Sequence, residues 1–388
     1  MTPRLVLHIG TEKTGTTSVQ ESLAGNRQKL AELGYCYPVS PGPANHVWLA
    51  MLAGQDRLVV DLAGFLGVPV PDLDLARAGF RRAFQAEMAA LPASVHTVVL
   101  SNEHCHGRLV RREEIQELKR FLAPHFREVE VWLYLRRQDR LAVSHYSTKL
   151  RGNFTAERIF PKVHPSAWYY NYFELASAWA EVFGRDAMRL RIYERRELLG
   201  QDVATDFLAQ LGIEDPAALL GLAQEANTAL SALGQVVLLE FNRRLQSDAA
   251  TDQLQRTLRP TRLRLANELG RRLKGPPRLP ARAEAEAFLA TYADANEWLR
   301  QSFFPDRSIL FDSDFSDYPA EETEVDGDRL ALARLLAEML AEAAAESLAV
   351  RARSARLAAQ ALRELRGGNL DGAQGLLQTL AGEAPPPA

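Results

Sequence analysis

The sequence predicts an α/β fold in which helices flank a central parallel sheet and a helical extension follows at the C-terminal end. Short apolar runs alternate with longer segments of helical periodicity as far as Asp202, and this alternation is typical of strands joined by helical crossovers. Several of the runs are apolar almost throughout, as expected of strands buried on both faces of a parallel sheet. Beyond Asp202 the pattern is almost wholly helical.

The expected strands and helices follow one another along the chain. A first strand at 5–9 leads through a loop rich in glycine and threonine into a helix at about 16–33. Further strands are expected at 97–100, 129–135 and 187–193, and an amphipathic helix at 171–183 precedes the last of them. Because the carboxyl ends of parallel strands meet at one edge of a sheet, we expect functional residues in the loops that follow these strands.

Length and charge limit the domain organisation and the class of partner. With 388 residues the chain exceeds a usual single core, so we expect a main domain at 1–320 and a helical extension at 321–388. A net charge of −3 lacks the basic excess typical of nucleic-acid-binding proteins. One block, residues 256–282, is nevertheless strongly basic, and its only acid is Glu268. It is either a solvated helix face or the border of an anion site.

Within the extension, residues 361–373 resemble one helix–turn–helix unit of the tetratricopeptide type. A single unit cannot stack into a solenoid, so we expect these helices to dock on the main domain or to mediate a homodimer.

Cysteine usage and hydropathy indicate the compartment. Cys36 and Cys105 lie far apart and match no metal-ligand spacing, which favours a reducing environment. The apolar stretch at the start of the chain is too short for a signal peptide, and no window reaches the roughly 20 apolar residues of a membrane span. We therefore expect a cytoplasmic protein with no transmembrane segment.

The loop after the first strand carries the strongest functional signal. Gly10 and Gly15 allow a ligand to approach the backbone closely, and the amides at the start of the next helix would point at an anion. The spacing of these glycines is that of a Walker A loop, which predicts a P-loop-type sheet. Thr16 stands where such a loop has its lysine, and the basic residue is Lys13 instead, so a standard ATPase or kinase is disfavoured.

Two motifs together resemble the PAPS-dependent sulfotransferases, in particular the bacterial carbohydrate-type enzymes (PAPS is 3′-phosphoadenosine 5′-phosphosulfate). The first is the family's 5′-phosphosulfate loop, matched here by Lys13, Thr14, Gly15, Thr16 and Thr17. The second is the family's 3′-phosphate site, in which an arginine ends a strand and a serine follows in the next helix, as Arg136 and Ser144 do. A guanidinium fork and a hydroxyl suit a phosphate monoester.

Further residues agree more weakly with this family. Tyr193 follows the fourth expected strand and resembles a tyrosine that lies near the adenine in many members. The resemblance covers roughly residues 4–315. The Gly-x-x-Gly-x-x-Lys loop of small-molecule enzymes is absent from the sequence, so the remaining 3′-phosphate contacts stay open, with residues 256–282 as a candidate source.

The resemblance implies transfer of a sulfuryl group from PAPS to a hydroxyl of a carbohydrate or glycolipid, with no metal required. Lys13 and the loop amides would stabilise the charge that develops on the leaving group. The acceptor hydroxyl needs a base, for which Glu103 and His46 are the leading candidates and His104 a third. Acceptor specificity is expected to depend on residues 40–95 and 150–170.

Two other function classes remain open at this stage. A P-loop kinase-like phosphotransferase would need a carboxylate–magnesium site, for which residues 101–103 are the candidate. A non-catalytic nucleotide-binding or scaffold protein would use the helical extension. Binding of adenosine 3′,5′-bisphosphate, of ATP with magnesium, or of neither separates the three classes.

Overall fold

The structure is a computed structural model that describes residues 2–220, 230–247 and 252–341, apart from 328, 332, 335 and 339, together with residues 360 and 363. The chain divides into two compact units. The first comprises Met1–Tyr146, Arg158–Thr228 and Leu279–Thr323, and the second comprises Ser147–Glu157, Ala229–Arg278 and Glu324–Ala388. The predicted main domain at 1–320 therefore includes two segments of the second unit, residues 147–157 and 229–278.

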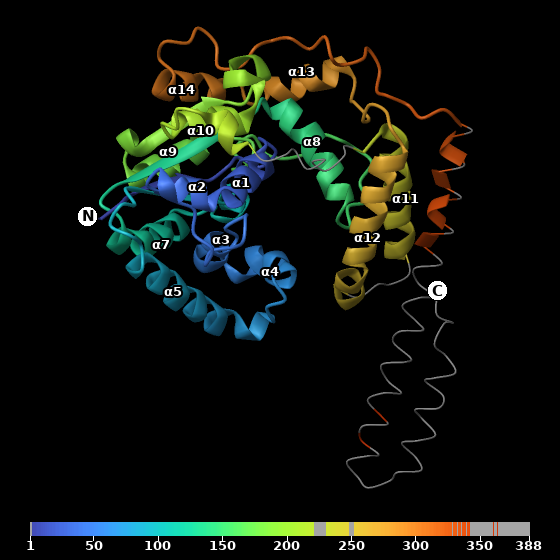
Figure 1. Ribbon diagram of the computed structural model, residues 1–388. Coiled ribbons are helices and arrows are strands. Elements are labelled where there is room, and N and C mark those ends of the chain that lie inside the picture. Colours follow the sequence, from blue (N-terminus) through green and yellow to red (C-terminus); the bar gives the residue numbers. More distant parts are fainter. Residues whose placement is uncertain are drawn as a thin grey trace. The chain divides into compact units, whose positions relative to one another are not determined.

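A five-stranded parallel sheet forms the centre of the first unit (Figure 1), with the strand order β2-β3-β1-β4-β5. The strands are β1 (Arg4–His8), β2 (Tyr35–Cys36), β3 (Thr97–Ser101), β4 (Val129–Leu135) and β5 (Met188–Ile192). In the register of the central strands, Val6 of β1 pairs with Val99 of β3 and Leu7 of β1 pairs with Val131 of β4. The predicted α/β class with a parallel sheet is confirmed, while the narrower P-loop type stays a prediction.

Helices connect the strands and continue after the sheet. Those of the first unit are α1 (Thr16–Gly25), α2 (Arg27–Glu32), α3 (Trp48–Ala53), α4 (Asp56–Phe65), α5 (Leu73–Ala89), α6 (His104–Arg108), α7 (Arg112–Leu122), α9 (Tyr172–Phe183), α10 (Val203–Gln210), α13 (Arg282–Ala290) and α14 (Ala293–Phe303). Short 3-10 turns are found at Val70–Asp72, Ala123–His125, Arg185–Ala187, Arg195–Glu197, Leu199–Gln201 and Pro216–Leu219. The boundary between the two units falls inside α8 (Gln138–Leu150), after Tyr146. None of the described helices is both long and apolar enough to cross a membrane.

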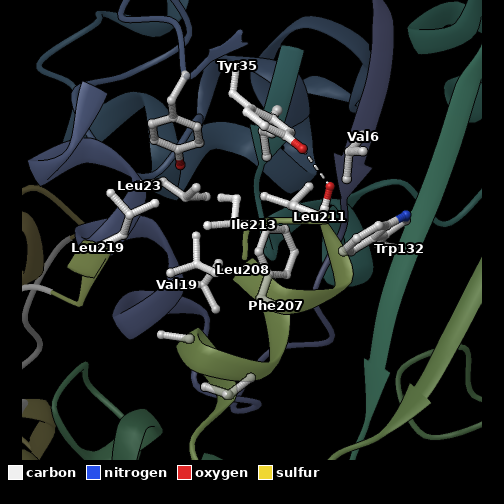
Figure 2. Close-up of a cluster of buried hydrophobic side chains, with 14 of the residues drawn as sticks. Val6, Val19, Leu23, Tyr35, Trp132, Phe207, Leu208, Leu211, Ile213 and Leu219 are labelled. Atoms are coloured by element: carbon white, nitrogen blue, oxygen red, sulfur yellow. Dashed lines mark hydrogen bonds between the residues drawn. The ribbon is translucent and has the colours of Figure 1, made fainter. Parts of the chain in front are cut away.

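One face of the sheet is sealed by α1, α2 and α10. Figure 2 shows the buried cluster formed there, in which Val6 and Trp132 of the strands meet Val19 of α1 and Phe207 of α10. The Tyr35 hydroxyl donates a hydrogen bond of 2.7 Å to the Leu211 carbonyl oxygen, which ties β2 to the end of α10. Helix α9 contacts β4 and β5 and also packs against α7 and α14. This packing fixes the carboxyl edge of the sheet, where the loops after β1, β3 and β4 converge.

The helix predicted at 16–33 is divided into α1 and α2 at Asn26. The Asn26 side-chain amide donates to the carbonyl oxygens of Ser22 and Leu219, at 2.8 and 2.7 Å. An asparagine side chain that bonds to nearby backbone competes with the helix ladder, which explains the break.

The second unit contains α11 (Ala232–Ser247) and α12 (Asp252–Arg272), which lie side by side in Figure 1. Arg262 of α12 is buried and donates to the Asn242 side-chain oxygen at 3.0 Å, and burial lowers the pKa of its guanidinium to about 10. The basic block at 256–282 therefore includes at least one structural arginine. The predicted hairpin at 361–373 lies outside the described residues apart from Arg363, so the homodimer expected from these helices stays a prediction.

Candidate anion-binding site

The loop between β1 and α1 turns sharply enough to expose its amides. Gly10, Lys13 and Gly15 all have positive φ, of 101°, 65° and 73°. A Cβ atom on Gly15 would lie 2.5 Å from Cγ1 of Val203, so this position requires glycine for space as well as for φ. A Cβ atom on Gly10 would be 3.2 Å from Cα of Glu103, which shows how closely the loop packs against the end of β3.

Hydrogen bonds hold the loop against the neighbouring strand β4. The amide and the hydroxyl of Thr11 both donate to the Tyr134 carbonyl oxygen at 3.0 Å, and the Thr14 hydroxyl donates to the Thr11 carbonyl oxygen at 2.6 Å. Among the described residues, by contrast, the amides of Gly15, Thr16 and Thr17 donate no hydrogen bond. Three consecutive donors at the start of a ten-residue helix are an arrangement suited to binding an anion.

Arg136 follows β4 directly and reaches this loop. Its Nη1 donates to the Lys13 carbonyl oxygen at 2.9 Å, and its guanidinium carbon lies 5.6 Å from the ring centroid of Tyr193. It forms no ion pair with an aspartate or glutamate among the described residues, and burial lowers the pKa of its guanidinium. A half-buried arginine without a carboxylate retains donors for an anionic ligand.

The next residue, Arg137, provides a direct contrast. It is buried and forms a fork with both oxygens of Asp139, at 2.8 and 2.9 Å. Its Nη1 also donates to a carboxylate oxygen of Asp312 at 2.6 Å. Arg137 therefore has a structural role, and of the two adjacent arginines only Arg136 lacks a carboxylate partner among the described residues.

The other predicted cofactor contacts lie on elements that converge here. Tyr193 follows β5, and its amide donates to the Leu135 carbonyl oxygen at 2.7 Å. A Cβ atom on Gly15 would lie 3.4 Å from the Tyr193 hydroxyl, so this side chain is next to the loop. Ser144 lies in α8, the helix that begins two residues after Arg136. The structure therefore brings Lys13, Arg136 and Tyr193 together, and it places Ser144 on the helix that Arg136 introduces.

Glu103 lies between β3 and α6, beside the loop. Its two carboxylate oxygens accept hydrogen bonds from the side-chain amides of Gln20, at 2.6 Å, and Asn45, at 3.1 Å. Both donors are neutral side-chain amides, which orient the carboxylate. Such an arrangement suits a group that accepts a proton from a bound hydroxyl.

His46 is enclosed in a different way from Glu103. It is fully buried, its Nδ1 accepts from the Ser101 amide at 3.2 Å, and its Nε2 lies 3.0 Å from the Pro38 carbonyl oxygen. Both ring nitrogens thus face backbone groups, and burial lowers the pKa of the imidazole to about 3. This geometry favours a role in holding the segment around Asn45 over direct proton transfer.

A cluster of ionisable residues beside the loop was not predicted. The Glu12 carboxylate accepts a hydrogen bond from the Tyr169 hydroxyl at 2.8 Å, and its oxygens lie 3.9 Å from Nδ1 of His104 and 4.0 Å from Nε2 of His145. Burial alone would raise the pKa of the Glu12 carboxyl, but the histidines hold it well below its usual range. Burial alone would lower the pKa of the His104 imidazole, but the neighbouring Glu12 carboxylate outweighs this effect and raises it.

Two further polar side chains, those of Asp206 and Ser231, have structural roles. Asp206 accepts from the Tyr134 hydroxyl and from both ends of the Arg191 fork, each at 2.7 Å, so it joins α10 to the sheet. The Ser231 hydroxyl accepts from the Gly234 amide at the start of α11. Among the described residues there is no group of three or more histidine, cysteine, aspartate or glutamate side chains that could hold a metal ion.

Comparisons with known proteins do not assign the chain to a family. No protein-family model matches it. An uncharacterized protein of Archaeoglobus fulgidus is 32% identical over 132 residues, which make up 34% of this chain and 35% of that protein. The match therefore spans about a third of either chain. No solved structure matches.

Proposed function

We propose that this chain is a PAPS-dependent sulfotransferase that transfers a sulfuryl group to a hydroxyl of a carbohydrate or glycolipid. The observation that carries the proposal is the contact between Arg136 and the Lys13 carbonyl oxygen, at 2.9 Å. It joins the two motifs that suggested the family, and it involves an arginine that has no carboxylate partner among the described residues.

The residues at this edge of the sheet fit the charges of PAPS. The amides of Gly15 to Thr17 offer donors for the 5′-phosphosulfate, and Lys13 adds a cation beside them. Arg136 and the Ser144 hydroxyl would bind the 3′-phosphate, and Tyr193, whose ring lies near the Arg136 guanidinium, would contact the adenosine. PAPS would supply the sulfuryl group, leaving adenosine 3′,5′-bisphosphate as the product.

The protein would contribute positioning and electrostatic stabilisation. Lys13 and the loop amides would stabilise negative charge on the departing phosphate oxygen. Glu103, oriented by Gln20 and Asn45, would take the proton of the acceptor hydroxyl. His46 would support this arrangement, because the side-chain amide of the adjacent Asn45 holds one Glu103 oxygen.

Calorimetric titration tests the proposal against its alternatives. Adenosine 3′,5′-bisphosphate should bind more tightly than ATP with magnesium, and PAPS should be turned over once an acceptor is supplied. A preference for ATP with magnesium would support a kinase-like phosphotransferase, and the absence of binding by either nucleotide would support a scaffold. Comparing sulfated glycans and lipids between a producing strain and a deletion strain would then identify the acceptor.

A further inference from the structure

A pocket of about 260 Å³ lies in the first unit, between residues 158–163 and the segment from α13 to Tyr292. Its walls include Phe160, Phe288 and Tyr292, and two basic residues, Arg158 and Lys162, also line it. The volume falls just below the range of about 300–1,000 Å³ typical of sites for drug-sized ligands. It therefore suits one ring better than an oligosaccharide or a nucleotide.

Stacked aromatic rings line one side of the pocket. The rings of Phe160 and Phe288 stack with centroids 4.5 Å apart and an interplanar angle of 3°. Tyr292 meets Phe288 edge to face at 5.5 Å, and Tyr170 packs behind both. Aromatic surfaces of this kind bind the apolar face of a six-membered ring.

The charges around the pocket favour an anion. Lys162 is exposed and forms no ion pair among the described residues. Arg158 is paired only loosely, with its Nη2 3.9 Å from Oε1 of Glu284. Because a single acid faces two bases, the lining carries a net positive charge that complements a carboxylate.

An unused donor lies in the same wall. The Tyr292 hydroxyl is buried and has no hydrogen-bond partner among the described residues. Burial raises the pKa of this phenol to about 12, so it stays a neutral donor. A buried hydroxyl without a partner is unfavourable. Because protein atoms cover it completely, a ligand oxygen would remove that penalty once the side chain turns toward the pocket.

Two consecutive residues link the pocket lining to the candidate anion site. Tyr170 packs against Phe288 and Tyr292 of the lining, and the preceding Tyr169 donates a hydrogen bond to Glu12, next to Lys13. Both tyrosines lie in the segment 150–170, which was expected to determine acceptor specificity. A ligand in the pocket would therefore lie near Tyr170, whose neighbour in the sequence, Tyr169, contacts the loop between β1 and α1.

We propose that this pocket binds a single six-membered ring bearing a carboxylate, as found in a uronic acid or in an aromatic acid. The ring would lie against Phe288, the more exposed ring of the stacked pair, and the carboxylate would meet Lys162 and Arg158. That this ring is part of the sulfate acceptor rests on the proposed function, whereas binding itself does not.

Binding to the full chain without any nucleotide tests the proposal by calorimetry and by ligand-observed NMR. The probes are glucuronate, 4-hydroxybenzoate and, as a neutral control, glucose. One of the two acids should bind and glucose should bind at least tenfold more weakly; which acid binds identifies the ring. Equal binding of glucose and glucuronate, or no binding of either acid, would overturn the proposal.

Variants locate the binding to this pocket. Lys162→Ala, at an exposed position, should weaken acid binding about tenfold, and Phe288→Leu and Tyr292→Phe should each weaken it several-fold. Arg82→Ala removes an exposed charge from α5 and should leave binding unchanged. Full binding by both Lys162→Ala and Phe288→Leu would overturn the pocket assignment. If the acids bind while adenosine 3′,5′-bisphosphate does not, the pocket stands and the proposed function fails.

Discussion

Nη1 of Arg136 donates a hydrogen bond to the backbone carbonyl oxygen of Lys13 across 2.9 Å. The two residues are far apart in the sequence and follow adjacent strands of the sheet, β4 and β1. A bound anion and this carbonyl oxygen would share one guanidinium, which has five N–H donors. The contact therefore positions Arg136 while using only one of the N–H donors of its guanidinium.

Arg136→Ala should weaken binding of adenosine 3′,5′-bisphosphate by about 2–4 kcal/mol, the cost of truncating one partner of a buried charge pair. The effect on turnover at saturating PAPS should be smaller. Calorimetry with adenosine 3′,5′-bisphosphate and with adenosine 5′-monophosphate provides the measurement. Retained selectivity for the 3′-phosphate would contradict the assignment.

Arg137→Ala should show the opposite behaviour and reduce the free energy of unfolding by about 3–5 kcal/mol, because it leaves the buried Asp139 carboxylate without its cationic partner. Urea denaturation followed by circular dichroism measures this loss. Arg136→Ala is the matched control, and its midpoint of urea denaturation should be close to that of the wild type. Similar losses of stability in both variants would show that Arg136 is also structural.

Lys13→Ala should abolish turnover while weakening adenosine 3′,5′-bisphosphate binding only modestly. Its ammonium would act mainly on charge that develops during transfer, and such interactions raise the rate more than they raise affinity. Single-turnover kinetics with PAPS and equilibrium titration with the product separate the two effects. Equal losses in rate and in binding would instead make Lys13 a simple anchor.

Glu103→Gln should lower turnover by about 10²–10⁴, the usual contribution of a general base, and should leave PAPS binding nearly unchanged. The glutamine retains one acceptor oxygen for Asn45 or Gln20, so the local structure is preserved. His46→Asn is the companion variant. An active Glu103→Gln enzyme beside an inactive, folded His46→Asn enzyme would assign proton transfer to the histidine.

Stability should fall as the pH decreases from about 6.5 toward 4.5. Burial lowers the pKa of His8 and His46 to about 3 and that of His106 to about 4, while the unfolded chain takes up protons near 6.5. The unfolded state therefore binds more protons in this window, and each histidine contributes a slope of up to about 1.4 kcal/mol per pH unit. Urea denaturation across the window measures the slope, which His46→Asn should reduce and the exposed-site variant His164→Asn should not.

Much of the central sheet was predictable from the sequence because β1, β3 and β4 are largely apolar runs. The strand predicted at 129–135 has the bounds of β4. The structure assigns β1 to Arg4–His8, one residue earlier than predicted. Strand β2, by contrast, has only two residues, Tyr35 and Cys36. A pair of residues at the sheet edge has no periodicity, so no pattern marked it.

The candidate site was predictable only where its residues lie close together in the sequence. The loop around Lys13 and the arginine after β4 are each readable as short motifs. The cluster around Glu12 is not, because His104, His145 and Tyr169 come from three separate segments and meet only in the folded chain. The motif spacing pointed to Arg136, but the structural role of the adjacent Arg137 could not be predicted, because one of its carboxylate partners is the distant Asp312.

Arg136 has no carboxylate partner among the residues that the structure describes, so anion binding there would couple to thermal stability. An anion that bound there would add RT ln(1 + [L]/Kd) to the free energy of unfolding, or about 2.7 kcal/mol at one hundred times Kd. The melting temperature then becomes a reporter of occupancy that requires no knowledge of the acceptor. A thermal-shift screen of nucleotides and inorganic anions, read against Arg136→Ala, can therefore rank the site's natural ligands before any reaction is observed.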